Sequence, residues 1–276
     1  MQQTAERVYR DKPEALPLPP PDLLVPEELE RLRRASGVAV VELAGRDSVA
    51  AALKAVDEAG FKTLIPTYVY TGSEHGSWEE VPQAWRRLRH ALPEAVELTD
   101  LLVMGSPRFW RALNGRYLQE LTRRYGFSPV CPGCHLYLHA ARIPLAQSLG
   151  GVPVVAGERL SHDGREKLNQ VAPAQKAYQE LFHGYGLELA LPLAQVTDGR
   201  EIEKILGLPW PEGGEQLGCV FSGNYLDPQG ALRVSLESLE AYFREFALPL
   251  ASLVTTAYLE GRTPDHLALA QGLLSA

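Results

Sequence analysis

Cysteine is scarce in this chain, with three among 276 residues. Two of them stand in one short stretch, Cys131-Pro132-Gly133-Cys134, and Cys219 lies far downstream. Three thiols cannot all pair with one another, so a disulfide framework explains them poorly. A CxxC pair with one remote cysteine instead supplies three soft ligands for a metal ion or an iron-sulfur cluster. The pattern predicts sulfur or metal chemistry.

Long apolar runs and excess positive charge are also lacking. No stretch of about 20 apolar residues could span a bilayer, and the N-terminus has no apolar signal core. We therefore expect a cytoplasmic protein with no membrane partner, whose thiols stay reduced. The net charge of -7 argues against a surface broadly covered by nucleic acid. The basic stretches 86–89 and 123–124 are expected to be solvated helix faces.

What the sequence does contain is an alternation of short apolar stretches with longer segments of helical period, beginning at Val38. This alternation is typical of a parallel α/β sheet. The expected strands are 38–43, 63–70, 96–104, 152–156 and 188–193, and the expected helices are 48–59, 78–92, 107–125, 131–149, 174–185 and 201–206. We predict an α/β fold with a doubly wound, mostly parallel, Rossmann-like (HUP) sheet and helices on both faces.

The pattern divides the chain into three parts. Residues 1–37 are predicted to form an extended, peripheral arm, with a proline-rich stretch at 16–21 and a short charged helix at 27–35 opened by Pro26. Residues 38–207 are predicted to form the nucleotide-binding α/β domain. Residues 208–276 carry Cys219 and are predicted to be an irregular, polar tail with one helix at 236–246. This tail must pack on the cleft if Cys219 is to reach the other two thiols.

The turn after the first expected strand could hold an anion. Ala44, Gly45 and Arg46 form a small turn before a helix that starts near Asp47 and Ser48. First-turn backbone amides have no intrahelical partner, so together with the Ser48 hydroxyl they could bind a phosphate. The alternative is that Asp47 or Ser48 only caps the helix, and geometry alone favours the cap.

The stretch Ala44-Gly45-Arg46-Asp47-Ser48 resembles the Ser-Gly-Gly-x-Asp-Ser loop of the PP-loop ATP pyrophosphatase superfamily, with Leu43 and Ala44 replacing the first Ser and the first Gly. Residues 154–164 and 191–202 are similar to later strands and loops of that family, so the resemblance covers about 38–206. It implies ATP and Mg²⁺ as cofactors. The implied catalytic candidates are Asp47 and Ser48, and the implied nucleotide-side residues are Ala44, Gly45, Arg46, Gly157, His162 and Asp163. Arg165, Lys167 and Asn169 are candidates for the rim of the same cleft.

The CxxC segment leaves four alternatives open when it is read from its residues. Pro132 at the first helical position would make Cys131 the N-cap, with its thiolate stabilised, and would align Cys131, His135 and His139 on one stripe. The first alternative is an iron-sulfur cluster on Cys131, Cys134 and Cys219, and the second is a zinc ion completed by His135 or His139. The third is a c-type haem at Cys131-x-x-Cys134-His135, which the α/β setting disfavours. The fourth is a redox CxxC or inert buried thiols.

A second resemblance bears on these alternatives. The tRNA 2-thiolation enzymes of the PP-loop superfamily carry a CxxC in mid-domain and one later cysteine, and these bind a 4Fe-4S cluster. The resemblance implies the same role for Cys131, Cys134 and Cys219, although this sequence has no cysteines for the zinc ribbons at the ends of the 2-thiouridine-forming enzymes. Our hypothesis is an enzyme in which ATP adenylates a carbonyl oxygen of tRNA or a small molecule, and sulfide on the open iron attacks the activated carbon.

Two other functions remain as alternatives. One is a zinc-containing PP-loop nucleotide-binding protein or AMP-forming ligase. The other is a degenerate, non-catalytic nucleotide-binding protein, suggested by Leu43 and Ala44. A homodimer is compatible with either, and the sequence identifies neither the substrate nor the sulfur donor.

Overall fold

The computed structural model describes residues 5–13, 15, 18, 23–210, 214 and 216–275. Within these ranges the centre of the molecule is a six-stranded sheet in which every pairing is parallel. Its strands are β1 (Val38–Glu42), β2 (Thr63–Val69), β4 (Glu97–Leu98), β5 (Leu102–Met104), β6 (Val154–Val155) and β7 (Leu189–Ala190). Their order is β4-β2-β1-β6-β7, and β5 also pairs with β2. The expected mostly parallel α/β sheet is confirmed.

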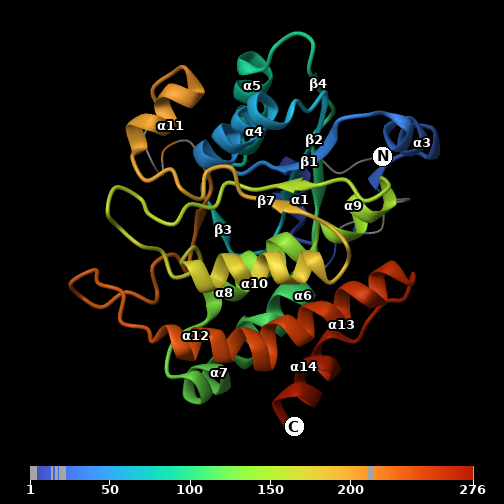
Figure 1. Ribbon diagram of the computed structural model, residues 1–276. Helices are drawn as coiled ribbons and strands as arrows, with labels where there is room; N and C mark the ends of the chain where they lie inside the picture. The colour runs from blue at the N-terminus through green and yellow to red at the C-terminus, as the bar shows by residue number, and fades with distance from the viewer. Residues whose placement is uncertain are drawn as a thin grey trace.

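Helices flank this sheet (Figure 1). Between the strands they are α4 (Arg46–Ala59), α5 (Glu80–Ala91), α6 (Pro107–Leu113), α7 (Leu118–Tyr125), α8 (Val130–Ala140), α9 (Ile143–Ser148) and α10 (Ala172–His183), and α11 (Gly199–Leu206) follows β7. β1 shows how the sheet separates two cores. Val38 and Val40 belong to one hydrophobic cluster and Ala39 and Val41 to the other, because successive strand residues point to opposite faces.

Two expected helices are each broken in the structure. The segment 107–125 is divided into α6 and α7 by a short 3-10 turn, η1 (Gly115–Tyr117), after Asn114 leaves helical geometry with φ -129° and ψ -82°. The segment 131–149 is divided into α8 and α9 near Arg142. Pro144 stands in the first turn of α9, where its missing N–H costs nothing. Helical periodicity in the sequence did not reveal either break.

The helix predicted at 236–246 is present, whereas the irregular, polar tail predicted beyond it was wrong. From Leu236 onward the chain forms α12 (Leu236–Tyr242), a π-helical turn η2 (Phe243–Ala247), α13 (Leu248–Leu259) and α14 (His266–Ser275). Leu250 and Val254 of α13 are fully buried in the same cluster as Val40. The C-terminal helices therefore complete the core on one side of the sheet, because the apolar surface they cover would otherwise face water.

The N-terminal part is also more ordered than an extended arm. Residues Ala5–Asp11 form α1, and Val8 is buried against Tyr68 and Trp78. The charged helix is confirmed as α3 (Pro26–Arg34). The proline-rich stretch 16–21 lies outside the described residues, apart from Leu18, which is buried. No helix in the described ranges is long and apolar enough to cross a bilayer.

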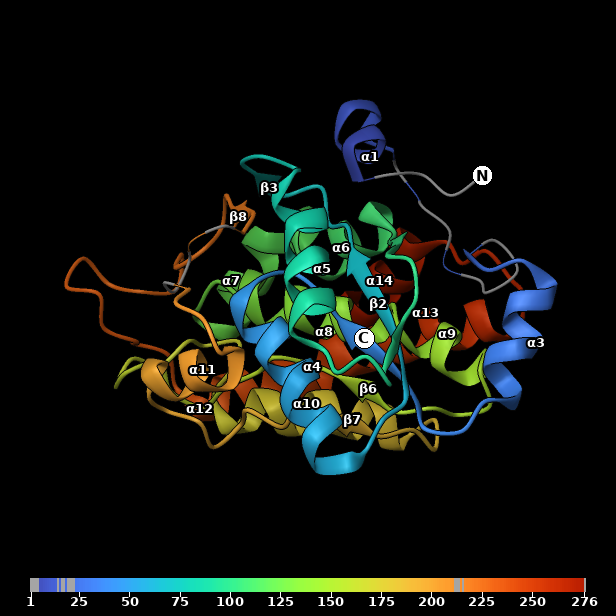
Figure 2. The same cartoon turned by 90° about the horizontal axis from the view of Figure 1, so that it is seen from above.

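A second, two-stranded sheet was not expected. β3 (Glu74–His75) pairs antiparallel with β8 (Gly218–Cys219), and the two strands lie side by side in Figure 2. This pairing joins the loop after β2 to the segment after α11. It brings residues 218–219 next to the segment that follows β2.

Candidate functional site

A cavity of about 860 Å³ opens at the carboxyl ends of β1, β2 and β6. Its wall combines the loop after β1, the end of β2 with β3, the start of α8, the loop after β6 and the segment around β8. The chain runs from β1 to β2 on one side and reaches β6 on the other, so strand order reverses between β1 and β6. Ligands of open α/β sheets bind at such a point.

The loop after β1 lines this cavity, and hydrogen bonds of the Ser48 side chain hold its conformation. The Ser48 hydroxyl accepts hydrogen bonds from the amides of Ala44 and Gly45, at 2.9 and 3.0 Å, and donates to the Gly45 carbonyl at 2.8 Å. Gly45, not Asp47 or Ser48, is the N-cap of α4, so the predicted cap was wrong. The Ser48 hydroxyl therefore organises the turn, and the first residues of α4, Arg46 to Ser48, line the cavity.

Gly157 allows the loop after β6 to approach this turn closely. A Cβ at Gly157 would lie 2.7 Å from the Ser48 amide nitrogen and 2.9 Å from the Asp47 carbonyl oxygen. The Gly157 amide donates to Glu42 Oε2 at 3.2 Å. Glycine is required here by the close packing of two backbones. Gly157 thus packs directly on the loop after β1.

Asp47 is surrounded by cationic side chains. Its Oδ1 accepts from Arg46 Nε at 2.8 Å, and its Oδ2 lies 3.5 Å from Arg159 Nη1 and 3.8 Å from His162 Nδ1. Arg46 and Arg159 are both buried. The Asp47 carboxylate is one-fifth exposed and compensates two buried guanidinium groups. It holds the base of the loop in place, and it also lines the cavity.

The residues predicted after β6 divide into two groups. Arg165, Lys167 and Asn169 line the cavity. His162 and Asp163 do not. His162 is fully buried behind the wall, where burial and then Lys167 lower its pKa below the ordinary value. Asp163 lines a neighbouring depression and accepts from the Gly199 amide at 2.7 Å, so the implied nucleotide-side position of these two residues does not match the structure.

All three cysteines are free, half-buried, and line the cavity. The β3–β8 pairing carries Cys219 there, with its Sγ 3.3 Å from the Ser73 hydroxyl. The Cys131 Sγ lies 3.5 Å from the Phe221 carbonyl oxygen, on the segment that follows β8. Gln216, which precedes β8, packs on Gly45, where a Cβ would overlap its side chain. Residues 216–219 and 221–223 line the same cavity, so Cys219 shares its wall with the other two thiols.

The thiols are not activated by the helix end, contrary to the sequence-based prediction. α8 begins at Val130 after Pro129, so Cys131 lies inside the first turn and is not the N-cap. Burial, followed by the nearby Cys219, raises the pKa of Cys131 to about 12. Burial also raises the pKa of Cys134 well above its ordinary value. Burial therefore favours the neutral form of both thiols, and a bound cation would favour their thiolates.

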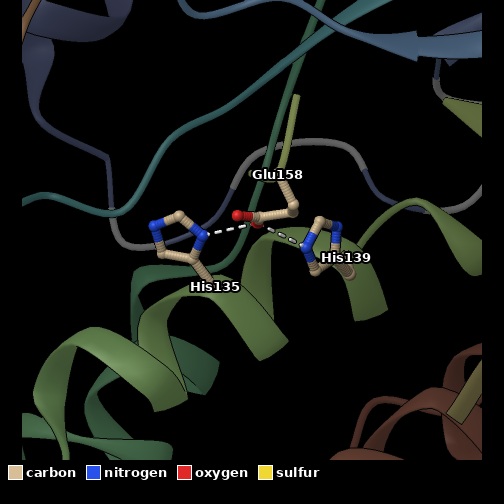
Figure 3. Close-up of side chains that lie close together, drawn as sticks. All are labelled: His135, His139 and Glu158. Carbon is tan, nitrogen blue, oxygen red and sulfur yellow. Dashed lines mark hydrogen bonds and ion pairs between the residues drawn. The ribbon is translucent and has the colours of Figure 1, made fainter. Parts of the chain in front are cut away.

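His135 and His139 lie on one face of α8 and point to Glu158, which follows β6 (Figure 3). Glu158 Oε1 lies 2.6 Å from His135 Nδ1 and 3.0 Å from His139 Nε2. Burial alone would raise the pKa of Glu158, but the two histidines hold it well below its ordinary value. Burial lowers the pKa of His135, and Glu158 outweighs that effect and raises it.

The predicted stripe of Cys131, His135 and His139 therefore does not form a single ligand set. In the described part of the chain, the group of three potential ligands whose donor atoms all lie within 4.8 Å of one another is His135, His139 and Glu158. Cys131 instead contacts Phe221 and Asn224. The two histidines are thus partners of Glu158 and not of the thiols.

No family model matches the sequence. An uncharacterized protein of Methanocaldococcus jannaschii, MJ0009, is 37% identical to the chain over 215 residues, which are 77% of this chain and 77% of that protein. The chain belongs to the same family as this archaeal protein. Since that relative is uncharacterized, conclusions about what this member of the family does depend on the geometry of the site.

Sequence reasoning missed two acidic residues of the site in this family member. Glu158 was not a candidate, although it directly follows Gly157 at the end of an expected strand, a position where α/β sheets bind ligands. Glu74 was missed as well. Its carboxylate accepts from the Thr71 and Gly72 amides at 2.7 and 2.8 Å, and no local pattern marks the β3 strand that it begins.

Proposed function

We propose that this protein is an ATP-dependent sulfurtransferase that uses a 4Fe-4S cluster held by Cys131, Cys134 and Cys219. The observation that carries the proposal is that the three thiols and the loop 44–48 line one cavity. Its volume of about 860 Å³ is within the range of small-molecule and cofactor sites. The strand order β4-β2-β1-β6-β7 supports a doubly wound sheet, in which a cavity between the loops after β1 and β6 would lie at the switch point.

The donor set fits a cluster better than a single zinc ion. A tetrahedral zinc ion with bonds of about 2.3 Å draws its sulfur ligands to about 3.8 Å from one another. Among the described residues, the three cysteines do not form a group whose ligand atoms all lie within 4.8 Å of one another. The histidines that were expected to complete a zinc site contact Glu158 instead. A four-iron cluster is larger than one ion and holds its thiolates further apart. It would supply one iron without a protein ligand, where a sulfur atom can bind.

The loop 44–48 and nearby cations are suited to the phosphates of ATP·Mg²⁺. The amides at the start of α4 and the positive end of its dipole favour an anion. Arg165 and Lys167 line the same cavity and can offset negative charge on the leaving pyrophosphate. In the reaction, a carbonyl oxygen of the substrate bonds to the α-phosphorus as pyrophosphate leaves. Sulfide then replaces that oxygen on carbon, and AMP leaves.

One observation favours the non-catalytic alternative. The Ser48 hydroxyl is engaged by Ala44 and Gly45, so it does not point to a phosphate as a catalytic loop serine would. With Leu43 in place of the first Ser of the PP-loop pattern, the loop offers amides in place of hydroxyls. A protein that binds a nucleotide without cleaving it would have the same geometry. Release of pyrophosphate from ATP separates the two functions.

The decisive experiment is anaerobic purification with iron and acid-labile sulfide analysis. We expect about four of each per chain and broad absorption near roughly 400 nm. Cys219→Ser should lose most of the iron, and Ser222→Ala, on the same cavity wall, should keep it. Colourless protein with stoichiometric zinc would overturn the cluster. Calorimetry with ATP·Mg²⁺ tests the nucleotide separately, and absence of binding would overturn the ATP-dependent step.

A substrate assay completes the test. The cluster-loaded protein, sulfide and ATP·Mg²⁺ are incubated with unmodified tRNA or with small carbonyl compounds, and sulfur incorporation and AMP are measured. AMP formation that depends on the acceptor identifies the substrate class. The acidic net charge of -7 favours a small acceptor over a broad nucleic-acid surface.

A further inference from the structure

The pair His135 and His139 has the spacing of a metal-binding helix pair. The two residues are one turn apart on α8, and the carboxylate of Glu158 reaches both rings from the end of β6 (Figure 3). Side chains at i and i+4 lie on one face of a helix, so both imidazoles can reach the same point. Two histidines and one carboxylate are a ligand set of catalytic zinc sites and of non-haem Fe(II) sites.

Two buried atoms of this cluster have no hydrogen-bond partner among the described residues. Glu158 is 1% exposed, and its Oε2 is unpaired. His139 is fully buried, and its Nδ1 is unpaired as well. A buried carboxylate oxygen without a donor is costly to fold. A bound cation would satisfy the carboxylate without any further donor.

His135 has an outer partner of the kind that orients metal ligands. Its Nε2 lies 2.8 Å from the side-chain amide of Asn169. The Asn169 atom nearest this nitrogen is Nδ2. If Nδ1 is bound to a metal, Nε2 carries the proton, and the Asn169 amide turned by about 180° presents its oxygen as acceptor. Histidine ligands of metals almost always donate their other N–H in this way.

The spacing of the ligands requires only a small adjustment. Bonds of about 2.0–2.1 Å in tetrahedral geometry separate ligand atoms by about 3.3 Å. The two nitrogen-to-oxygen distances to Glu158 Oε1 are now 2.6 and 3.0 Å, and all three donor atoms lie within 4.8 Å of one another. Side-chain rotations that move each ligand atom by less than about 1 Å make room for an ion.

We propose that His135, His139 and Glu158 bind a divalent transition-metal ion, with zinc the best match to this ligand set. His135 and Glu158 line the cavity, whereas His139 lies behind its wall. The remaining coordination position therefore faces the cavity, as in catalytic zinc sites, where it can take an oxygen of a substrate. The site is independent of the cysteines and stands whether or not they hold a cluster.

The test uses Co²⁺, a spectroscopic substitute for zinc, with the full chain in which Cys131, Cys134 and Cys219 are replaced by serine. We expect one Co²⁺ per chain, visible d–d bands of a nitrogen and oxygen site, and no thiolate charge-transfer band. Zn²⁺ should displace the Co²⁺ and raise the melting temperature, because a ligand that binds only the native state stabilises it. Absence of both the Co²⁺ spectrum and the Zn²⁺-dependent stabilisation would overturn the site.

Variants then assign the ligands. His139→Gln and Glu158→Gln should weaken Co²⁺ binding by more than about 100-fold, and Asn169→Ala by about 10- to 100-fold. His183→Gln, at an exposed position on α10, is the matched control and should bind Co²⁺ unchanged. Unchanged affinity in His139→Gln would also overturn the assignment.

A measurement on the unaltered chain tests the site even if the variants fail to fold. The Co²⁺-loaded protein should show paramagnetically shifted imidazole ring signals from two histidines in its proton NMR spectrum. Large contact shifts of imidazole ring protons require a direct cobalt–nitrogen bond, so a cobalt ion bound by thiolates alone would not produce them. A Co²⁺-loaded chain without shifted imidazole signals would contradict the proposal.

Discussion

Cys219 lies directly opposite Glu74 in the antiparallel pair of β3 and β8. This register places the last cysteine of the chain beside the end of β2, on the wall of the cavity. Glu74 fixes the turn before β3 by accepting from the Thr71 and Gly72 amides. The position of this thiol therefore depends on the turn that Glu74 holds.

Replacing Glu74 with alanine should loosen the position of Cys219. The turn amides lose their acceptor, and the short β3–β8 pair has little else to hold it. We expect the alkylation rate of the Cys219 thiol in metal-free protein to rise several-fold, measured by mass spectrometry. Glu79→Ala, at an exposed neighbouring position, is the control. Equal rates in Glu74→Ala and the wild type would show that the pairing does not depend on Glu74.

Replacing Gly157 with alanine should strain the contact between the two cavity loops. The added methyl group would lie 2.7 Å from the Ser48 amide nitrogen, with backbone on both sides. We expect a loss of about 1–3 kcal/mol in the free energy of unfolding, measured with urea, and weaker ATP binding. Gly272→Ala is the control, because a Cβ there meets nothing within 4 Å in α14 and should stabilise the helix by about 0.5–1 kcal/mol. Similar stability changes in both variants would contradict the close approach.

Replacing Asp47 with asparagine should destabilise the protein as well as the loop. Arg46 and Arg159 are buried and would lose their carboxylate. We expect a cost of roughly 2–3 kcal/mol, below that of fully buried pairs because Asp47 is partly exposed. Chemical denaturation measures it, and Asp198→Asn, in an exposed pair with Arg200, should change little. Unchanged stability with loss of pyrophosphate release would show that Asp47 acts in the reaction alone.

His266 should make the docking of α14 sensitive to acid. Its Nε2 accepts from the Tyr258 hydroxyl at 2.7 Å, its ring stacks on Phe109, and burial lowers its pKa to about 4. The folded state thus favours neutral imidazole. The associated stability is present above the ordinary pKa of about 6.5 and is lost as the pH falls toward 4, with a limit of roughly 3 kcal/mol.

The measurement is urea unfolding at several pH values between about 7 and 5. The slope of stability against pH should decrease in His266→Gln and stay unchanged in His90→Gln, at an exposed position on α5. A wild-type slope in His266→Gln would show that another group is responsible for the acid sensitivity.

Local elements were well predicted wherever one short stretch carries the whole signal. α4 ends at Gly60, whose φ of 67° is the left-handed cap expected of glycine. β1 and β2 were found from their buried β-branched residues, and α11 was found almost to its ends. Predictions were poorest for 248–275, because the nearly all-apolar α13 and α14 lack the polar face that reveals a helix boundary.

The candidate site was partly predictable for the same reason. The turn 44–48 and the CxxC are contiguous motifs, so their chemistry could be recognised in the sequence. The cap at Gly45, the burial of the thiols and the pairing of His135 with Glu158 were not recognisable. Each depends on what another element places beside the residue.

The sequence by itself determined the βα alternation, the small-residue turn after β1 and the three thiols, since these follow from local periodicity and residue type. Only the tertiary structure decided that the pairing of β3 with β8 carries Cys219 to the cavity. It also decided that His135 and His139 contact Glu158 and not the thiols. The physical reason is that backbone pairing and burial join residues far apart in the chain. Burial also changes the charge that those residues carry. Neither effect can be predicted from any short stretch of sequence.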